Sequence, residues 1–212
     1  MIVALLVVAG YVAGSMPFGY WLVRLAKGID IRTVGSGNIG ASNVWRTYGR
    51  RYGLPVMLLD TAKGFAPALA ATFVEGSLAG VLAGGAAMLG HWRPLFLRFA
   101  KGGKMVATTG GAFLGVAPEV GGIGAGVWIV VFLLTRYASV ASMTAALSLP
   151  AVAAALGEPW PVIAFGAAAA AGVIVLHRGN IRRLLAGTES RFEFRRRRPP
   201  TARAAPWSGR TP

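Results

Sequence analysis

The sequence predicts an all-α membrane protein with seven transmembrane helices, and three observations lead to this fold class. Hydrophobic residues make up 55% and charged residues 14% of the chain, whereas soluble domains average about 45–50% and about 25%. Apolar runs close to the roughly 20 residues that cross a bilayer recur along the whole sequence. Lysine and arginine concentrate between alternate runs, as they do in multi-span proteins.

Seven apolar segments define the expected spans, which cover residues 2–23, 54–74, 77–97, 105–117, 120–135, 138–156 and 160–176. The fourth segment is short for a bilayer, so we expect a tilted, broken or partly submerged helix there. Small residues four apart, such as Gly80 and Gly84, suit close packing between these helices. Pro17 is expected to kink or end the first helix.

The distribution of charge predicts the orientation of the spans. The connections at 75–77, 118–119 and 157–159 contain no lysine or arginine, and the connections at the opposite ends contain many. The positive-inside rule therefore places the N-terminus outside and the C-terminus in the cytoplasm. Because the outer connections are only a few residues long, we expect any polar site to lie at the cytoplasmic face.

Composition also excludes several kinds of site. The chain contains no cysteine, which excludes disulfides, thiolate metal ligands and cysteine nucleophiles. Its two histidines, His91 and His177, are too few for a histidine-built metal centre, and we predict neither a metal nor a cofactor.

The net charge of +15 comes partly from a Pro/Arg-rich segment after the last span. We therefore divide the chain into a seven-span domain, residues 1–189, and a basic, disordered cytoplasmic tail, residues 190–212. Such a tail suits contact with anionic lipid, and we expect no nucleic-acid partner.

The first polar motif is "GSGNIGASNVWR", residues 35–46. It satisfies G-x-G-x-x-G, but a dinucleotide site needs a strand before this loop, and membrane helices flank it here. Its glycines would let backbone N–H groups approach an anion, and the Arg46 guanidinium fits phosphate. Uncharged donors come from Ser36, Asn38, Ser42 and Asn43. The alternative is a polar turn with a helix cap and an arginine that only orients the chain.

The second motif is "RFAKGGKMVATTGG", residues 98–111. It is not a P-loop, because Arg98 and Met105 stand where that motif needs glycine and Ser/Thr. Gly102 and Gly103, followed by a helix from near Lys104, would still present N–H groups and positive charge to an anion. The alternative is an ordinary basic loop.

The third motif is "HRGNIRRLLAGTE", residues 177–189, where the last span leaves the membrane. His177, Asn180 and Glu189 are its candidate functional residues. His177 would accept a proton only if a substrate hydroxyl lies within reach; otherwise it is an interfacial histidine.

Two charged residues stand inside the second span. Asp60 and Lys63 are three positions apart on one helix face, so they can form an ion pair that lowers the cost of burying them. We interpret the pair as structural, with direct substrate contact as the alternative. We expect His91 to form a hydrogen bond within the helix bundle.

Together with "DTAKGFAP" and "TRYASVAS", the three motifs occur in an order and spacing that resemble the bacterial acyl-phosphate-dependent glycerol-3-phosphate acyltransferases, over about residues 5–190. The resemblance implies a multi-pass enzyme of the bacterial cytoplasmic (inner) membrane with its motifs at the cytoplasmic face. Such an enzyme moves the acyl group of a fatty acyl phosphate to the 1-hydroxyl of glycerol-3-phosphate. Lysophosphatidic acid and phosphate are the products, in the first acylation of phospholipid synthesis. We expect a functional monomer in contact with membrane lipid.

The resemblance also implies roles for residues at matching positions. The acyl phosphate would be bound by Ser36, Gly37, Asn38, Gly40, Gly102 and Gly103. Glycerol-3-phosphate would be bound by Arg46, Lys104, Ser142, His177 and Asn180. Catalysis would involve Ser36, Lys104, His177 and Asn180, supported by Asn43, Asp60, Lys63 and Glu189. The hydroxyl proton would pass either to a substrate phosphate oxygen or to His177.

The sequence departs from the family pattern at three positions. Ser42 replaces a usual threonine and keeps the hydroxyl, and Gly179 replaces a usually larger residue. Met105 replaces the last glycine of K-G-G-K-G, where it would narrow the phosphate site or meet a backbone conformation that suits glycine.

An alternative function is transport of an anion or phosphate ester, because an ion pair buried in a polytopic bundle is typical of transporters. The short outer connections and the absence of an internal repeat argue against it.

Overall fold

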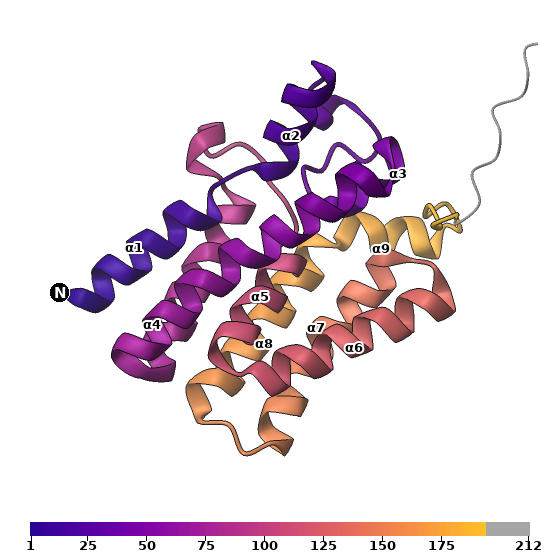
Figure 1. Ribbon diagram of the computed structural model, residues 1–212. Coiled ribbons are helices and arrows are strands. Elements are labelled where there is room, and N and C mark those ends of the chain that lie inside the picture. The colour runs from indigo at the N-terminus through magenta and orange to yellow at the C-terminus, as the bar shows by residue number, and fades with distance from the viewer. Residues whose placement is uncertain (194–212) are drawn as a thin grey trace, which may run out of the picture.

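The computed structural model describes residues 1–193, and all regular structure within that range is helical (Figure 1). The α-helices are α1 (Ile2–Gly14), α2 (Phe18–Lys27), α3 (Ala41–Tyr48), α4 (Arg50–Trp92), α5 (Val106–Val116), α6 (Pro118–Thr135), α7 (Ala138–Ala155), α8 (Trp160–Leu176) and α9 (Arg178–Leu185). Two 3₁₀ turns, η1 (Ile31–Thr33) and η2 (Leu95–Leu97), lie in the connections. The predicted tail falls outside the described residues from residue 194 onward.

Every predicted apolar segment corresponds to helix, and the first is broken where a proline was expected to act. Helix α1 ends at Gly14 and α2 begins at Phe18, so Pro17 separates them. A proline has no N–H to donate and clashes with the preceding turn, which accounts for the break. The short fourth segment forms α5, which has 11 residues.

Helix α4 is a hairpin of two antiparallel arms (Figure 1). Its direction reverses at Gly76, whose φ of 80° and ψ of −177° are not helical. A Cβ at Gly84 would lie 3.3 Å from the Cβ of Ala68, whereas these positions would be roughly 24 Å apart on one straight helix. The two arms are therefore packed closely, and Gly80 and Gly84 lie between them as their spacing predicted.

Length and apolar composition support a multi-pass membrane protein. Among residues 1–193, four helical stretches are long and apolar enough to cross a membrane: Ile2–Lys27, Arg50–Leu97, Pro118–Thr135 and Ala138–Ala155. A fifth is the pair α8 and α9, which is bent by 57°. The stretch Arg50–Leu97 contains both arms of the hairpin. The total of seven crossings and their orientation stay predictions.

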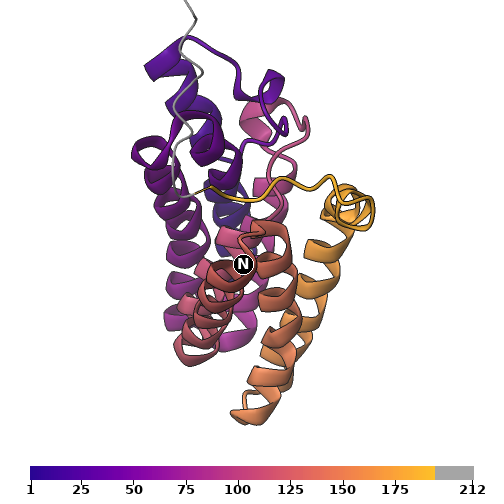
Figure 2. The ribbon, with the colours of Figure 1, turned by 90° about the vertical axis from the view of Figure 1, so that its right-hand side faces the viewer.

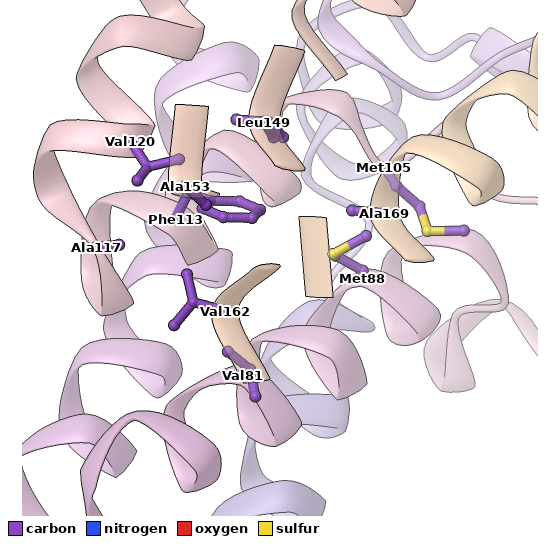
Figure 3. Packing of buried hydrophobic residues seen from close by; sticks show 10 residues of the cluster. All are labelled: Val81, Met88, Met105, Phe113, Ala117, Val120, Leu149, Ala153, Val162 and Ala169. Carbon is purple, nitrogen blue, oxygen red and sulfur yellow. The ribbon is translucent and has the colours of Figure 1, made fainter. Parts of the chain in front are cut away.

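The helices pack in chain order around an apolar core. Helix α1 lies against the second arm of α4, where a Cβ at Gly14 would come within 2.0 Å of the Ala87 carbonyl oxygen. Helices α5 to α8 follow, and Figure 3 shows the cluster between them, with Phe113 at its centre. Phe113 stacks on Phe165 with ring centroids 4.9 Å apart. This core extends from Val120 and Phe113 to Met105, which belongs to the second polar motif.

Candidate active site

A cavity of about 490 Å³ brings the three polar motifs together. Its walls come from the loop before α3, from α3 itself, from both arms of α4, from α5 to α9 and from the chain after α9. The sequence-predicted site residues that line it are Ser36, Asn38, Gly40, Asn43, Arg46, Asp60, Lys104, Ser142, His177, Asn180 and Glu189. Gly37, Lys63, Gly102 and Gly103 are not part of this lining. Beyond the polar end the walls are apolar, and they include Leu114, Trp128 and Leu149.

The polar end is organised by a chain of hydrogen bonds that ends on a carboxylate. Lys104 Nζ donates to Asn180 Oδ1 at 2.5 Å. Asn180 Nδ2 donates to Glu189 Oε1 at 2.6 Å, and Ser139 Oγ donates to the same oxygen at 2.8 Å. Arg183 Nε donates to Glu189 Oε2 at 2.6 Å. Glu189 therefore joins the second motif, α7 and α9.

Ser139 was not among the predicted site residues. It lies on α7 three positions before Ser142, so the two serines share a helix face. That spacing is the signal by which the sequence would have indicated it.

The network shifts the pKa values of both its charged ends. Burial alone would raise the pKa of Glu189, but hydrogen bonds from Asn180, Ser139 and Arg183 outweigh burial and keep that pKa below its usual value. Burial, followed by the nearby Arg183 charge, lowers the pKa of Lys104 to about 8. At neutral pH the site thus contains a carboxylate and a lysine that is still mostly cationic.

His177 lies at the junction of α8 and α9, buried against the same network. Its Nδ1 is 2.8 Å from the Val173 carbonyl oxygen. A carbonyl only accepts, so Nδ1 carries the proton and Nε2 is left as an acceptor. Burial and then the Lys104 charge lower the pKa of His177 to about 4. The ring is therefore neutral at physiological pH.

The loop of the first motif is held by Asn43. Asn43 Oδ1 accepts from the Ser36 N–H at 2.9 Å, and its Nδ2 donates to the carbonyl oxygens of Val34 and Asn38 at 3.0 and 2.9 Å. The Gly40 N–H donates to Asn38 Oδ1, and the Gly37 N–H donates to the Val34 carbonyl. The amides of Ser36, Gly37 and Gly40 are therefore used inside the loop and are not free, although the sequence had suggested free N–H groups; binding of the acyl phosphate by these residues stays a prediction.

The second motif requires a similar correction. The N–H groups of Gly102 and Gly103 donate to the carbonyl oxygens of Trp92 and His91, each at 2.9 Å. A Cβ on Gly103 would lie 1.9 Å from His91 Nε2, so this glycine permits close packing. Asn38 Nδ2 also donates to the Gly102 carbonyl at 3.3 Å, which ties the first two motifs together.

The helix after the second motif begins at Val106, slightly later than expected, with Met105 as its N-cap. Met105 has a φ of 67°, so the residue that replaces the family glycine does adopt a glycine-like backbone conformation. Val106 and Ala107 line the cavity. N–H groups in the first turn of a helix have no partner within the helix, so this end of α5 presents donors to the site.

Ser142 lines the cavity deeper than Ser139. Its hydroxyl donates to the Ala138 carbonyl at 2.6 Å and accepts from Trp128 Nε1 at 3.1 Å. Trp128 was not predicted, and its indole joins α6 to α7 at this point. These bonds fix Ser142 within the cavity wall.

Arg46 is exposed at the mouth of the cavity, where the chain after α9 crosses back toward α3 (Figure 2). Its Nη1 donates to the Ser190 carbonyl at 3.2 Å, and its guanidinium lies 5.1 Å from the centre of the Phe192 ring. Phe192 is buried and lines the cavity. Packed structure thus continues past residue 189, as far as Phe192; the basic, disordered tail stays a prediction.

The ion pair predicted inside the second span is present. Lys63 Nζ lies 2.8 Å from Asp60 Oδ1 and donates to the Met16 carbonyl at 2.8 Å, at the break between α1 and α2. His91 Nδ1 is 3.8 Å from Asp60 Oδ1, too far for a hydrogen bond, so the bond predicted for this ring is not found at that atom.

A multi-pass helical fold with cations and amides at the head of an apolar cavity is typical of an integral membrane protein that binds molecules with a charged head and an apolar chain. The family model described as glycerol-3-phosphate acyltransferase matches residues 4–187, and the chain belongs to this family.

Individual relatives agree with this assignment. The glycerol-3-phosphate acyltransferase of Desulforudis audaxviator is 46% identical over 194 residues, covering 92% of this chain and 98% of that protein. A crystal structure of PlsY (YgiH), an integral membrane glycerol 3-phosphate acyltransferase in its glycerol 3-phosphate form, has a TM-score of 0.87 and 42% identity. That match covers 91% of this chain and 96% of the other. The lysophosphatidic acid form of PlsY has a TM-score of 0.85 at the same identity and coverage.

Proposed function

We propose that this protein transfers the acyl group of a fatty acyl phosphate to the 1-hydroxyl of glycerol-3-phosphate, giving lysophosphatidic acid and inorganic phosphate. The observation that carries the proposal is the joining of a cationic, hydrogen-bonded pocket to an apolar cavity. Lys104, Asn180 and His177 lie at the polar end, and the same cavity continues between α5, α6 and α7. An acyl phosphate has this form, a charged head on an apolar chain.

The cations and helix donors supply binding for phosphate. Lys104 and Arg46 lie at the head of the cavity, and the first turn of α5 adds N–H groups with partial positive charge. Ser36 and Ser42 add hydroxyl donors on the opposite wall. Asn43 and Glu189 have supporting roles, since the first orders the loop and the second orients Asn180 and Lys104.

The reaction follows from this placement. The 1-hydroxyl oxygen of glycerol-3-phosphate attacks the acyl carbonyl carbon, the new ester bond forms, and the bond from that carbon to the phosphate oxygen breaks. Phosphate is a good leaving group, so positioning and charge stabilisation suffice without a covalent enzyme intermediate. Lys104 stabilises negative charge on the departing phosphate.

His177 can orient the attacking hydroxyl, because it lines the cavity and its Nε2 is the ring nitrogen left as an acceptor. Its pKa of about 4 makes it a weak base. We therefore assign the hydroxyl proton to an oxygen of the departing phosphate, with His177 as its hydrogen-bonding guide.

For topology we propose seven spans, an outside N-terminus and an active site at the cytoplasmic face of the bacterial inner membrane. The support is the positive-inside pattern, together with the gathering of all three motifs at one end of the bundle. All these site residues come from one chain, which supports a functional monomer.

The decisive experiment supplies the purified protein in lipid with glycerol-3-phosphate and either an acyl phosphate or an acyl-CoA. We expect lysophosphatidic acid from the acyl phosphate and much less from the acyl-CoA. The absence of product from acyl phosphate would refute the proposal. Uptake of glycerol-3-phosphate into sealed vesicles without an acyl donor would instead support the transport alternative.

A further inference from the structure

The apolar part of the cavity has a closed end. On α7 the lining positions are Ala138, Ser139, Ser142, Ala145, Ala146 and Leu149, which repeat at the spacing of one helix face. The next position on that face is Ala153, which is fully buried in the core and does not line the cavity. The cavity therefore ends at Leu149, roughly 15 Å along α7 from Ser139 at about 1.5 Å per residue.

Helix α6 ends the cavity at the same depth. Its lining positions begin with Gly121 and Gly124 and continue to Phe132 near the polar end. Val120, at the turn beyond Gly124, is fully buried in the core. In Figure 3, Val120, Ala153 and Phe113 lie together, with Leu149 one turn of α7 away from Ala153.

Leu149 occupies this end because α6 carries a glycine across from it. Leu149 is 5% exposed, and a Cβ built on Gly124 would lie 2.8 Å from Leu149 Cδ2. The atom in the way is the tip of a flexible side chain, so an alanine at 124 would push that tip and not the backbone.

Exposed residues lie along one side of the cavity, from Leu54 on α4 to Ala125, the neighbour of Gly124, on α6. Leu54, Ala125 and Ile129 line the cavity and are exposed on its rim. An apolar chain therefore reaches the cavity from the side, with its terminal methyl directed at Leu149 and Gly124.

We propose that Leu149, packed across Gly124, determines the longest acyl chain that the protein uses efficiently. This inference rests on the proposed function, because it identifies the occupant of the apolar cavity as the acyl chain. A smaller side chain at 149 lengthens the cavity, and a larger one at 124 shortens it.

The test measures kcat/KM for a series of acyl phosphates of increasing chain length with Leu149→Ala and Gly124→Ala. A chain too long for the cavity is overpacked against Leu149, which should lower its kcat/KM by roughly fivefold to over a hundredfold. We expect Leu149→Ala to raise the ratio of long-chain to short-chain kcat/KM about tenfold or more, and Gly124→Ala to lower it. The KM for glycerol-3-phosphate should stay unchanged in both.

Matched controls are available on the same helices. Leu147 on α7 is 57% exposed, and a Cβ at Gly126 on α6 would meet open space. Leu147→Ala and Gly126→Ala should keep the chain-length profile of the unaltered protein. Thermal unfolding of each variant reports whether it is folded, and Gly124→Ala provides the test if Leu149→Ala does not fold.

The outcomes separate the two proposals. If the unaltered protein makes no product from any acyl phosphate, the proposed function is wrong and this inference falls with it. If the unaltered protein is active but the variants change all chain lengths in proportion, the proposed function stands and Leu149 does not set chain length.

Discussion

Replacing Met105 by glycine separates the two opposing effects that act on this residue. Met105 has a φ of 67° and is 6% exposed, packed in the cluster that contains Met88 and Ala169. The left-handed conformation costs a non-glycine residue about 1–2 kcal/mol. Burial of a methionine side chain contributes about 1.5–3 kcal/mol. The methionine is therefore tolerated because burial offsets the backbone strain.

Comparison with alanine makes the magnitude testable. Met105→Ala removes the buried side chain but keeps the strained backbone, which should lower the free energy of unfolding by about 2–5 kcal/mol. Met105→Gly removes the same side chain and also relieves the strain, so it should cost about 1–2 kcal/mol less than Met105→Ala. This order reverses the usual helical preference for alanine over glycine of about 0.5–1 kcal/mol.

The assay is thermal unfolding of the purified variants in one detergent, where about 1 kcal/mol shifts Tm by roughly 2–4 °C for a chain of this size. Gly122→Ala on α6 serves as the control. A Cβ at this position meets open space, so the alanine variant should be more stable than the unaltered protein with glycine. Turnover of Met105→Gly should stay close to that of the unaltered protein. Glycine adopts the left-handed conformation at position 105 without strain, so the neighbouring Lys104 keeps its place. A Met105→Ala variant at least as stable as Met105→Gly would refute this account of position 105.

Three further predictions concern the polar end of the cavity. Lys104→Ala and Arg46→Ala should each raise the KM for glycerol-3-phosphate by roughly tenfold to over a hundredfold, since a lost hydrogen bond to a charged group costs about 1.5–3 kcal/mol. Lys101 is an exposed lysine, so Lys101→Ala should leave this KM unchanged. Equal effects of all three variants would count against the site. Because the pKa of Lys104 is lowered to about 8, its cation is present below that pH and lost above it. The kcat/KM for glycerol-3-phosphate should therefore fall as the pH rises through about 8, and a flat profile from pH 7 to 9.5 would contradict this. Ser139→Ala should lower kcat/KM about fivefold or more by removing one donor to Glu189, whereas Ser148→Ala on the same helix should have no effect in the same assay.

Hydrophobic patterning predicts most of this fold, because burial in lipid demands continuous apolar helices. It predicted the hairpin within Arg50–Trp92, since the spans 54–74 and 77–97 are joined by residues 75–77, but not that the direction reverses at a single glycine, Gly76. A short connection between two apolar runs leaves the turn geometry open. The break at Pro17 was predictable because a proline lacks an N–H donor and its ring clashes with the preceding turn of a helix.

The sequence predicted which residues form the candidate site better than it predicted how those residues interact. Motif positions indicated Lys104, His177, Asn180 and Glu189, which the structure gathers around one cavity. The glycine N–H groups were expected to be free and are hydrogen-bonded, since a sequence does not show which carbonyls lie within reach of an amide.

Two members of the cavity wall escaped prediction for a different reason. Trp128 and Phe192 reach the site only through helix packing and a chain reversal after α9. Contacts of this kind join residues that are far apart in the sequence, so no short sequence motif predicts them.

The position of Glu189 late in the chain determines when the site can exist. Its carboxylate accepts from Ser139, Asn180 and Arg183, and through Asn180 it orients Lys104. A chain is synthesised from its N-terminus and its early segments fold first. A chain that has not yet reached residue 189 lacks the carboxylate that orients Asn180 and, through it, Lys104. Under the proposed function, the polar end of the site is therefore completed only after all the helices up to α9 have been synthesised.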